Sequence, residues 1–195
     1  MVASIFIQFL LYYFQTGDFF IVSYEGETFN FLKPEFFNVL FSYKKGLLLY
    51  VPILFWALLF IMLTRNNWHK KVFFLLTLVF FLYITSSWWC WWYGGSFSQR
   101  SLIDIYPLLA LPLAAFVFEL SQISVNKQKV IQVVIGLLVL LNIFQTVQYK
   151  YNIIDFDGMT AKEYVHVFGS LDDKQIDTTL LDKPDYDKAV LGLGE

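Results

Sequence analysis

Four long apolar segments, separated by polar loops, constrain the fold of this chain more than any other feature of its sequence. They occupy residues 46–64, 72–87, 102–120 and 130–149, and the second is lengthened by the tryptophans that follow it. A helix needs about 20 apolar residues to cross the hydrocarbon core of a bilayer. A soluble domain of 195 residues could not bury a sequence that is 57% hydrophobic and 21% aromatic. We therefore expect an all-α integral membrane protein with about four full transmembrane helices.

The N-terminal segment, residues 1–16, is apolar and aromatic but too short for a full span. It has neither a basic region at its start nor a small-residue cleavage site, which argues against a signal peptide. We interpret it as a partial transmembrane helix, so that the chain is a fragment of a longer protein. A tilted or interfacial helix is the alternative.

The positive charges of two short loops predict how the chain is oriented. Residues 65–71 and 121–129 are basic and lie on the same face of the membrane if the spans alternate, and the positive-inside rule places such loops in the cytoplasm. The loop 17–46 and the tryptophan-rich loop after residue 87 then lie on the outer face, which disfavours ATP-driven chemistry. We divide the chain into a transmembrane region, residues 1–149, and an extracytoplasmic acidic tail, residues 150–195. The tail has a weak helical pattern near residues 160–168.

The loop 17–46 contains a short amphipathic segment. Pro34 is expected in the first turn of a helix over EFFNVLF, whose apolar side chains would lie along the membrane surface: Phe36, Phe37, Leu40 and Phe41. Lys44 and Lys45 follow, directly before the first long span, in which Pro52 lies near the start, where a helix tolerates proline. The lysines either reach the lipid headgroups as anchors or help to hold a lipid phosphate.

The segment Ser86–Pro107, SSWWCWWYGGSFSQRSLIDIYP, is the most distinctive part of the chain. Its tryptophans suit the membrane interface, and they could also form a platform on which a sugar stacks. Gly94 and Gly95 permit backbone conformations closed to other residues and the close approach of another group. An arginine at a membrane boundary is costly unless it is paired or faces water, and its guanidinium matches phosphate and carboxylate oxygens. We therefore expect a polar site at one membrane face, in which Arg100 meets an anion.

Asp104 offers Arg100 a partner within the chain. Four residues apart on an α-helix, the two side chains would share one face and could pair. This structural role is compatible with anion binding, because a carboxylate can orient a guanidinium whose other donors face a ligand. The carboxylates of the outer loop, Asp18, Glu25 and Glu27, form no pattern that singles out a catalytic base.

Several classes of site are disfavoured by the sequence. Cys90 is the one cysteine, so the chain has neither an internal disulfide nor enough thiolate ligands for a metal. His69 and His166 lie far apart in different kinds of segment, and we predict no metal site from them. The chain has no P-loop, no GxGxxG motif and no basic patch that would bind nucleic acid.

The run SWWCWWYGGSFSQRSLIDIYPLLALP, together with the upstream LFSYKKGLLLYVPIL, resembles the C-terminal half of the GT-C type membrane glycosyltransferases. These include the dolichyl-phosphate-mannose mannosyltransferase and aminoarabinose-transferase-like enzymes, and the likeness is greatest to the multi-spanning members of Bacteroidetes-type bacteria. In those proteins an aromatic-Gly-Gly segment leads to an arginine and a proline-containing helix, which here match Trp91, Gly94, Gly95, Arg100 and Pro107. The resemblance covers roughly residues 17–150, with a weak match around DGMTAKEY in the tail.

The resemblance implies a multi-pass protein of the bacterial inner membrane, with its functional loops and tail on the periplasmic side. Such enzymes transfer a sugar from a polyprenyl-phosphate donor to a glycan, lipid or protein acceptor. Their catalytic aspartate lies in the first outer loop of an N-terminal half that this sequence lacks, so the role is not transferred to Asp18 and we expect the fragment alone to be inactive. A divalent metal is compatible with the resemblance, but the sequence offers no ligand set that can be named.

On this resemblance Arg100 binds the lipid phosphate, with Lys44 and Lys45 as secondary electrostatic contacts. A cation beside a leaving phosphate stabilises the charge that develops there. The tryptophans and Tyr93 would form the walls of a sugar or lipid entrance. The full set of expected site residues is Arg100, Lys44, Lys45, Trp88, Trp91, Tyr93, Gly94, Gly95, Gln99 and Asp104.

Two other functions remain open from the sequence. The first is a non-enzymatic membrane scaffold or assembly protein, in which the tryptophans are anchors and Arg100 pairs with Asp104. The second is a transporter or flippase-like module, which would need polar residues or broken helices at mid-membrane. The nearly uncharged centres of the predicted spans disfavour the transporter.

Overall fold

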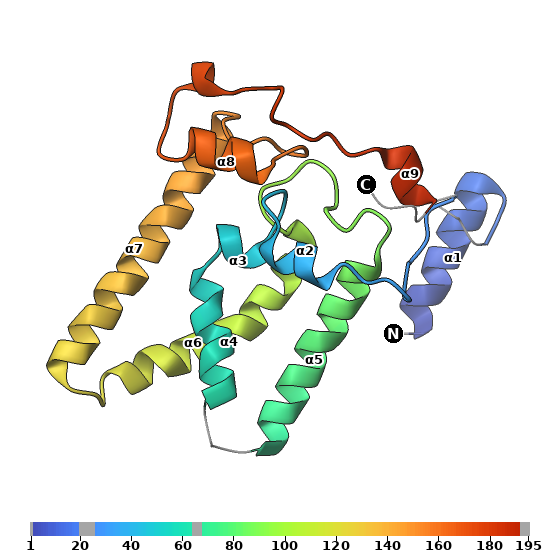
Figure 1. Ribbon diagram of the computed structural model, residues 1–195. Helices are drawn as coiled ribbons and strands as arrows, with labels where there is room; N and C mark the ends of the chain where they lie inside the picture. Colours follow the sequence, from blue (N-terminus) through green and yellow to red (C-terminus); the bar gives the residue numbers. More distant parts are fainter. Residues whose placement is uncertain (1, 20–25, 64–67, 192–195) are drawn as a thin grey trace.

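The described part of the chain is built from helices. The computed structural model describes residues 2–19, 26–63 and 68–191 (Figure 1). Within these ranges no strand is formed, and an isolated antiparallel bridge joins Phe29 to Trp88. The helices are α1 Val2–Thr16, α2 Phe36–Phe41, α3 Leu47–Tyr50, α4 Ile53–Leu63, α5 Trp68–Ser87, the 3₁₀-helix η1 Arg100–Ile105, α6 Tyr106–Leu120, α7 Val125–Lys150, α8 Ala161–Val167, the 3₁₀-helix η2 Asp173–Gln175 and α9 Tyr186–Val190.

Among the described residues, two helical segments are long and apolar enough to cross a membrane. They are Arg100–Leu120, which joins η1 to α6, and α7, with mean hydropathies of 1.9 and 2.3. Only 22% and 6% of their most apolar stretches are buried within the chain, whereas the core helix of a soluble protein would be mostly buried. This exposure favours insertion into a membrane. The helix α4 and the apolar part of α5, Lys71–Ser87, are shorter.

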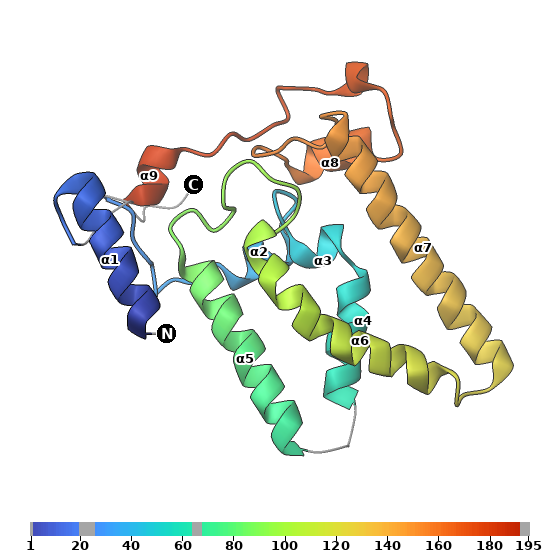
Figure 2. The same ribbon diagram turned by 180° about the vertical axis from the view of Figure 1, so that it is seen from behind.

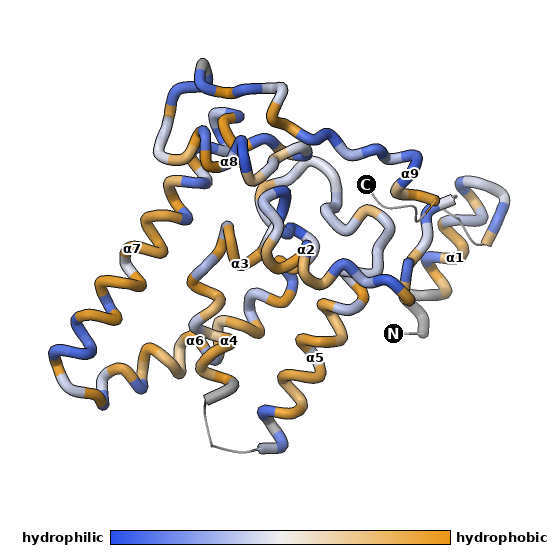
Figure 3. Tube along the Cα trace, in the orientation of Figure 1, coloured by the Kyte–Doolittle hydropathy of each residue, from blue (hydrophilic) through white to orange (hydrophobic). Residues whose placement is uncertain are grey.

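The apolar helices α4 to α7 form one part of the structure, and short helices and loops gather at one of its ends. Figure 3 shows hydrophobic residues along these four helices and hydrophilic residues mainly at their ends and in the tail. We call the end that holds α2, α3, residues 88–99, α8 and α9 the loop end (Figures 1 and 2). In Figure 2, α6 crosses α4. The rings of Trp56 on α4 and Phe116 on α6 stack with centroids 5.4 Å apart. Residues 65–67 of the first basic loop lie outside the described residues.

Pro52 interrupts the first predicted span. The sequence predicts one helix over residues 46–64, but the structure has α3 and α4 with Val51 between them in a non-helical conformation (φ −129°, ψ 61°). The α conformation is disfavoured for a residue that precedes proline, and proline has no N–H to continue the helical hydrogen bonds. The prediction of a continuous helix through Pro52 is therefore wrong.

Side chains from α7 bind the backbone carbonyls that this interruption leaves without helical partners. The Asn142 amide donates to the Tyr50 carbonyl, and Gln145 Nε2 donates to the Leu49 carbonyl at 3.4 Å. An unpaired backbone carbonyl is costly in an apolar environment. These two side-chain amides therefore provide the hydrogen bonds that the two carbonyls lack, and they hold α7 against α3.

The tryptophans do not lengthen the second predicted span, because α5 ends at Ser87. Trp88 forms its bridge with Phe29 instead, and the Trp89 N–H donates to the Thr28 carbonyl at 3.2 Å. The Trp88 N–H still donates to the Thr85 carbonyl at 3.4 Å, and from Trp89 onward backbone pairing with the preceding loop replaces the helical hydrogen bonds.

The short amphipathic helix predicted before the first long apolar segment is confirmed as α2. It begins at Phe36, with Glu35 at its N-terminal cap position, so Pro34 precedes the helix and does not lie in its first turn. Val39 is 0% exposed, whereas Phe37 is 73% exposed. One face of α2 therefore packs against the chain and the other presents aromatic rings outward.

The acidic tail folds back onto the loop end. The helix expected near residues 160–168 is present as α8, and the Thr160 hydroxyl caps it by accepting from the Glu163 N–H at 3.2 Å. Gln148 of α7 donates to the carbonyls of Val167 and Ser170 at 2.9 and 2.8 Å. The tail is thereby attached to the end of α7.

Gln145→Leu should destabilise the chain, because it removes the donor to the Leu49 carbonyl and to the Tyr164 hydroxyl, which lies 2.7 Å from Gln145 Nε2. Acceptors left unpaired in the interior should lower the free energy of unfolding by about 1–3 kcal/mol. Thermal unfolding in detergent, followed by circular dichroism, measures this. Gln128→Leu, near the other end of α7, is the matched control, and an equal loss in both variants would contradict the capping role.

Candidate functional site

Two glycines shape the loop between α5 and η1. Gly94 has a φ of 62° and the neighbouring Tyr93 a φ of 54°, in the left-handed region that glycine adopts most readily. At Gly95 the constraint is space, because a Cβ atom would lie 3.1 Å from the ring of Phe156 in the tail. The two glycines therefore turn the chain and allow the close approach that the sequence predicts.

The Lys45 side chain joins three parts of the chain at the loop end. It is 0% exposed, and its ammonium donates to the carbonyls of Ser96 and Phe156 and to Ser96 Oγ at 3.3 Å. Burial lowers the pKa of Lys45 to about 8, and the negative charges of Asp157 and Asp155 oppose this shift. With its donors bound in the interior, Lys45 has none exposed for the lipid phosphate that the sequence suggested.

Lys44 is also held within the chain. It is 8% exposed, and its Nζ lies 5.1 Å from the centroid of the Trp92 ring, in a cation–π arrangement. Trp92 itself is 1% exposed. Lys44 therefore contributes to the packing of the tryptophans in the loop between α5 and η1.

The residues on either side of Arg100 have unused hydrogen-bonding capacity. Gln99 is 0% exposed and its Nε2 donates to the Trp91 carbonyl at 2.6 Å. Its Oε1 and the buried hydroxyls of Ser98 and Ser101 find no partner among the described residues. Buried polar atoms without partners are uncommon, so this stretch can still accept hydrogen bonds or donate them.

Arg100 and Asp104 do not form the pair that the sequence allows. The pairing requires an α-helix, but Arg100 to Ile105 form η1, which has about three residues per turn, so side chains four apart no longer share a face. Both side chains are exposed, and no ion pair joins Arg100 to a carboxylate of the described ranges. The Arg100 guanidinium is thus accessible to an external anion.

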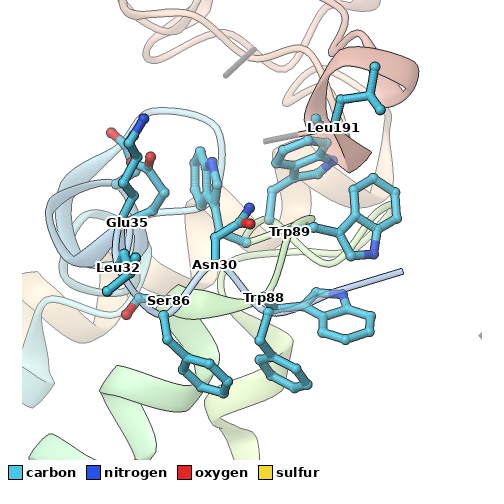
Figure 4. A pocket seen from close by; sticks show the side chains of 14 residues that line it. Asn30, Leu32, Glu35, Ser86, Trp88, Trp89 and Leu191 are labelled. Carbon is cyan, nitrogen blue, oxygen red and sulfur yellow. The ribbon is translucent and has the colours of Figure 1, made fainter. Parts of the chain in front are cut away.

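A groove of about 900 Å³ lies at the loop end beside the tryptophan segment (Figure 4). We call it the tryptophan groove. In Figure 4, Trp89 and Leu191 lie on one side of it and Leu32 and Glu35 on the other. Its lining residues are Phe29, Asn30, Phe31, Leu32, Lys33, Glu35, Asn38, Ser86, Trp88, Trp89, Trp91, Trp92, Ala189 and Leu191.

The groove brings together only part of the expected site. Trp88 and Trp91 line it. The other expected residues do not belong to its lining: Arg100, Lys44, Lys45, Tyr93, Gly94, Gly95, Gln99 and Asp104.

Aromatic rings held by specific contacts form one wall of the groove. Trp89 Nε1 donates to Glu27 Oε2 at 2.8 Å, which fixes the orientation of the indole. The Phe29 ring packs edge-on against Trp88 with centroids 4.7 Å apart. Trp88 and Trp89 are only partly buried, whereas Trp91 and Trp92 are 5% and 1% exposed. Trp88 and Trp89 therefore offer ring surface to a ligand.

Within the described ranges, Glu35 is the one carboxylate of the lining, and the sequence did not single it out. Asn38 Nδ2 donates to Glu35 Oε2 at 2.9 Å, and the Glu35 backbone N–H donates to the Ser86 carbonyl at 2.8 Å. The signal that could have found it is its position at the cap of the amphipathic helix, directly after Pro34. Of the carboxylates considered from the sequence, Glu27 orients Trp89, Asp18 lies outside the groove lining, and Glu25 lies outside the described residues.

The helix α9 closes one side of the groove. The Tyr186 hydroxyl donates to Asp157 Oδ2 at 2.6 Å and accepts from Trp92 Nε1 at 3.4 Å. Burial and the hydrogen bond to Asp157 raise the pKa of Tyr186 to about 12. Ala189, one turn further on, is 5% exposed and lines the groove. The tail therefore supplies a wall of the candidate site.

Comparison with protein-family models, with curated proteins and with solved structures finds no match to this chain. Among the described residues, no group of three or more His, Cys, Asp and Glu side chains could hold a metal ion.

Lys45 should make the stability of the folded chain depend on pH. Its pKa is about 8 in the folded chain and 10.5 when unperturbed, so between these values the unfolded state binds more protons. The free energy of unfolding should therefore increase as the pH rises from about 8 to about 10.5. Chemical unfolding across this pH range measures the slope. Lys45→Met should reduce it, while Lys188→Met, at an exposed position, should leave it unchanged; equal slopes in wild type and Lys45→Met would contradict the assignment.

Tyr186→Phe should loosen α9 from the tryptophans, because it removes the hydroxyl that bonds Asp157. Acrylamide should then quench tryptophan fluorescence more strongly than in the wild type. Tyr151→Phe, at a side chain that is 58% exposed, is the control. Quenching that is the same in the wild type and in both variants would show that this hydroxyl does not hold the wall in place.

Proposed function

We propose that this chain is the C-terminal part of a GT-C type glycosyltransferase of the bacterial inner membrane, and that it binds the phosphate of a polyprenyl-phosphate sugar donor. The observation that carries the proposal is the exposed Arg100 guanidinium, which begins the membrane-span candidate Arg100–Leu120 and has no carboxylate partner among the described residues. The likeness of the segment Ser86–Pro107 to these enzymes supports the same function.

The chemistry of Arg100 suits a lipid phosphate. A guanidinium presents a planar fork of N–H donors that matches two phosphate oxygens, and lipid phosphates lie where a span meets the membrane surface. When the sugar is transferred, the polyprenyl phosphate leaves as an anion, and a cation beside it stabilises the developing charge.

A second groove supports a lipid partner. It has a volume of about 490 Å³ and lies between the α2–α4 segment and α7. The described residues of its lining all have apolar or aromatic side chains, which favours a hydrocarbon chain over a polar ligand, and we assign this groove to the polyprenyl chain. Its lining residues are Phe41, Leu48, Leu49, Pro52, Phe55, Trp56, Val134 and Leu138.

In this proposal the loop end faces the periplasm. The basic start of α7, with Lys127 and Lys129, belongs to the opposite end of the helix and would lie in the cytoplasm by the positive-inside rule. The outward-facing Phe37 of α2 would then lie on the periplasmic surface of the inner membrane. The acceptor, a glycan, lipid or protein, would approach from the periplasm. The catalytic base would be supplied by another part of the enzyme.

The scaffold alternative predicts different geometry. In a scaffold, Arg100 would be engaged with Asp104 and would have no cavity beside it. The absence of that ion pair from the described residues supports the transferase.

Arg100→Ala tests the proposal directly. In lipid nanodiscs, the wild-type chain should bind undecaprenyl phosphate more tightly than uncharged undecaprenol, and Arg100→Ala should weaken binding of the phosphate lipid about tenfold or more. Arg100→Lys should restore part of the affinity, because a point charge replaces the planar fork. Lys127→Ala, at the start of α7, is the control for a general loss of positive charge. In the complete transferase, Arg100→Ala should abolish transfer while membrane insertion is retained, and wild-type turnover or binding by this variant would contradict the phosphate role.

A further inference from the structure

We infer that the tryptophan groove binds a neutral carbohydrate and that Glu35 is the residue that receives its hydroxyl groups. It rests on the proposed function in one respect: if the chain belongs to a glycosyltransferase, the carbohydrate in this groove is the acceptor sugar. It adds that this surface is distinct from the phosphate contact at Arg100, which is not part of the groove lining.

The wall of partly exposed rings matches one face of a sugar. A pyranose ring presents a flat face of C–H groups and a rim of hydroxyls, and the C–H face packs on an aromatic ring. Trp88 and Trp89 are partly exposed, and Phe29 is 41% exposed. Because Glu27 orients the Trp89 indole and Phe29 packs edge-on against Trp88, this wall needs little ordering when a ligand binds.

Glu35 supplies hydrogen-bond acceptors for the hydroxyl groups at the rim of a sugar ring. An ionised carboxylate accepts hydrogen bonds without donating any, and its two oxygens have room for several donors. The Asn38 amide uses one position on Oε2 at 2.9 Å, and the backbone bond to the Ser86 carbonyl fixes the chain at Glu35. The carboxylate is therefore held in place while it keeps free acceptor sites for ligand hydroxyls. Asn38 acts as a positioning residue.

The charge of the groove argues against an anionic ligand. Among the described residues, Lys33 and Glu35 are the charged members of the lining, and their charges cancel. A site for phosphate or another anion would gather cationic side chains, whereas the lining residues that the structure describes include no arginine. The volume of about 900 Å³ lies within the range of pockets that hold small organic ligands. A neutral polyhydroxylated ligand fits both the charge and the size.

Sugar binding by the chain in lipid nanodiscs tests the inference. Detergents with maltoside or glucoside headgroups must be absent at the end of the preparation, because such headgroups would compete for the groove. We would titrate glucose, galactose, mannose and maltose and follow tryptophan fluorescence and heat of binding. The wild type should bind at least one of them with a change in fluorescence, and Glu35→Gln should weaken that binding about tenfold.

Glu35→Gln keeps the size of the side chain at an exposed position, so folding should be retained. Trp88→Leu should weaken binding as well. The matched controls are Glu119→Gln, at the far end of α6, and Trp68→Leu, at the start of α5, and both should bind as the wild type does. A wild type that binds none of the four sugars, or a Glu35→Gln variant with wild-type affinity, would overturn the inference.

Undecaprenyl phosphate binding, measured in the same preparations, separates the two proposals. A wild type that binds this lipid but no sugar would contradict the carbohydrate groove and leave the proposed function standing. A wild type that binds sugar through Glu35 but not the phosphate lipid would support the groove and contradict the donor site.

Discussion

The buried Lys45 ammonium is the interaction on which the loop end depends. It lies in the turn between α2 and α3. It donates to the carbonyl of Ser96, in the loop between α5 and η1, and to the carbonyl of Phe156 in the tail. An ammonium is costly to bury unless its donors are bound, and these carbonyls offset that cost. The same contact brings Phe156 against Gly95. The tail can then continue to α9, whose residues complete the tryptophan groove.

A second constraint comes from the backbone of the apolar helices. Pro52 breaks the first long apolar segment, and the carbonyls that it leaves without partners are bound by amide side chains of α7. In an apolar environment such groups must be satisfied within the chain. The polar residues Asn142 and Gln145, in an otherwise apolar helix, thus have a structural reason for their positions. They also set the position of the end of α7, to which the tail is attached through Gln148.

Together these contacts produce two surfaces with different chemistry at one end of the molecule. Arg100 is exposed and has no carboxylate partner among the described residues, which suits an anion, while the tryptophan groove is aromatic and of balanced charge, which suits a neutral ligand. An enzyme that joins a phosphate-linked sugar to an acceptor needs both kinds of surface close together. The lysines before the first long apolar segment, by contrast, have structural roles. Lys45 binds the loop between α5 and η1 and the tail, and Lys44 packs on Trp92.

The sequence by itself determined the helical class, the positions of most helices and the importance of the segment Ser86–Pro107, because hydrophobic length and glycine or proline chemistry act locally. It also indicated why the paired glycines are needed. Only the tertiary structure decided that Lys45 is buried, that Arg100 and Asp104 lie apart on a 3₁₀ turn, and that Glu35 and α9 meet the tryptophans. These outcomes depend on contacts between residues far apart in the chain, such as Lys45 with Phe156 and Trp92 with Tyr186. Local patterns carry no information about which distant segments will meet.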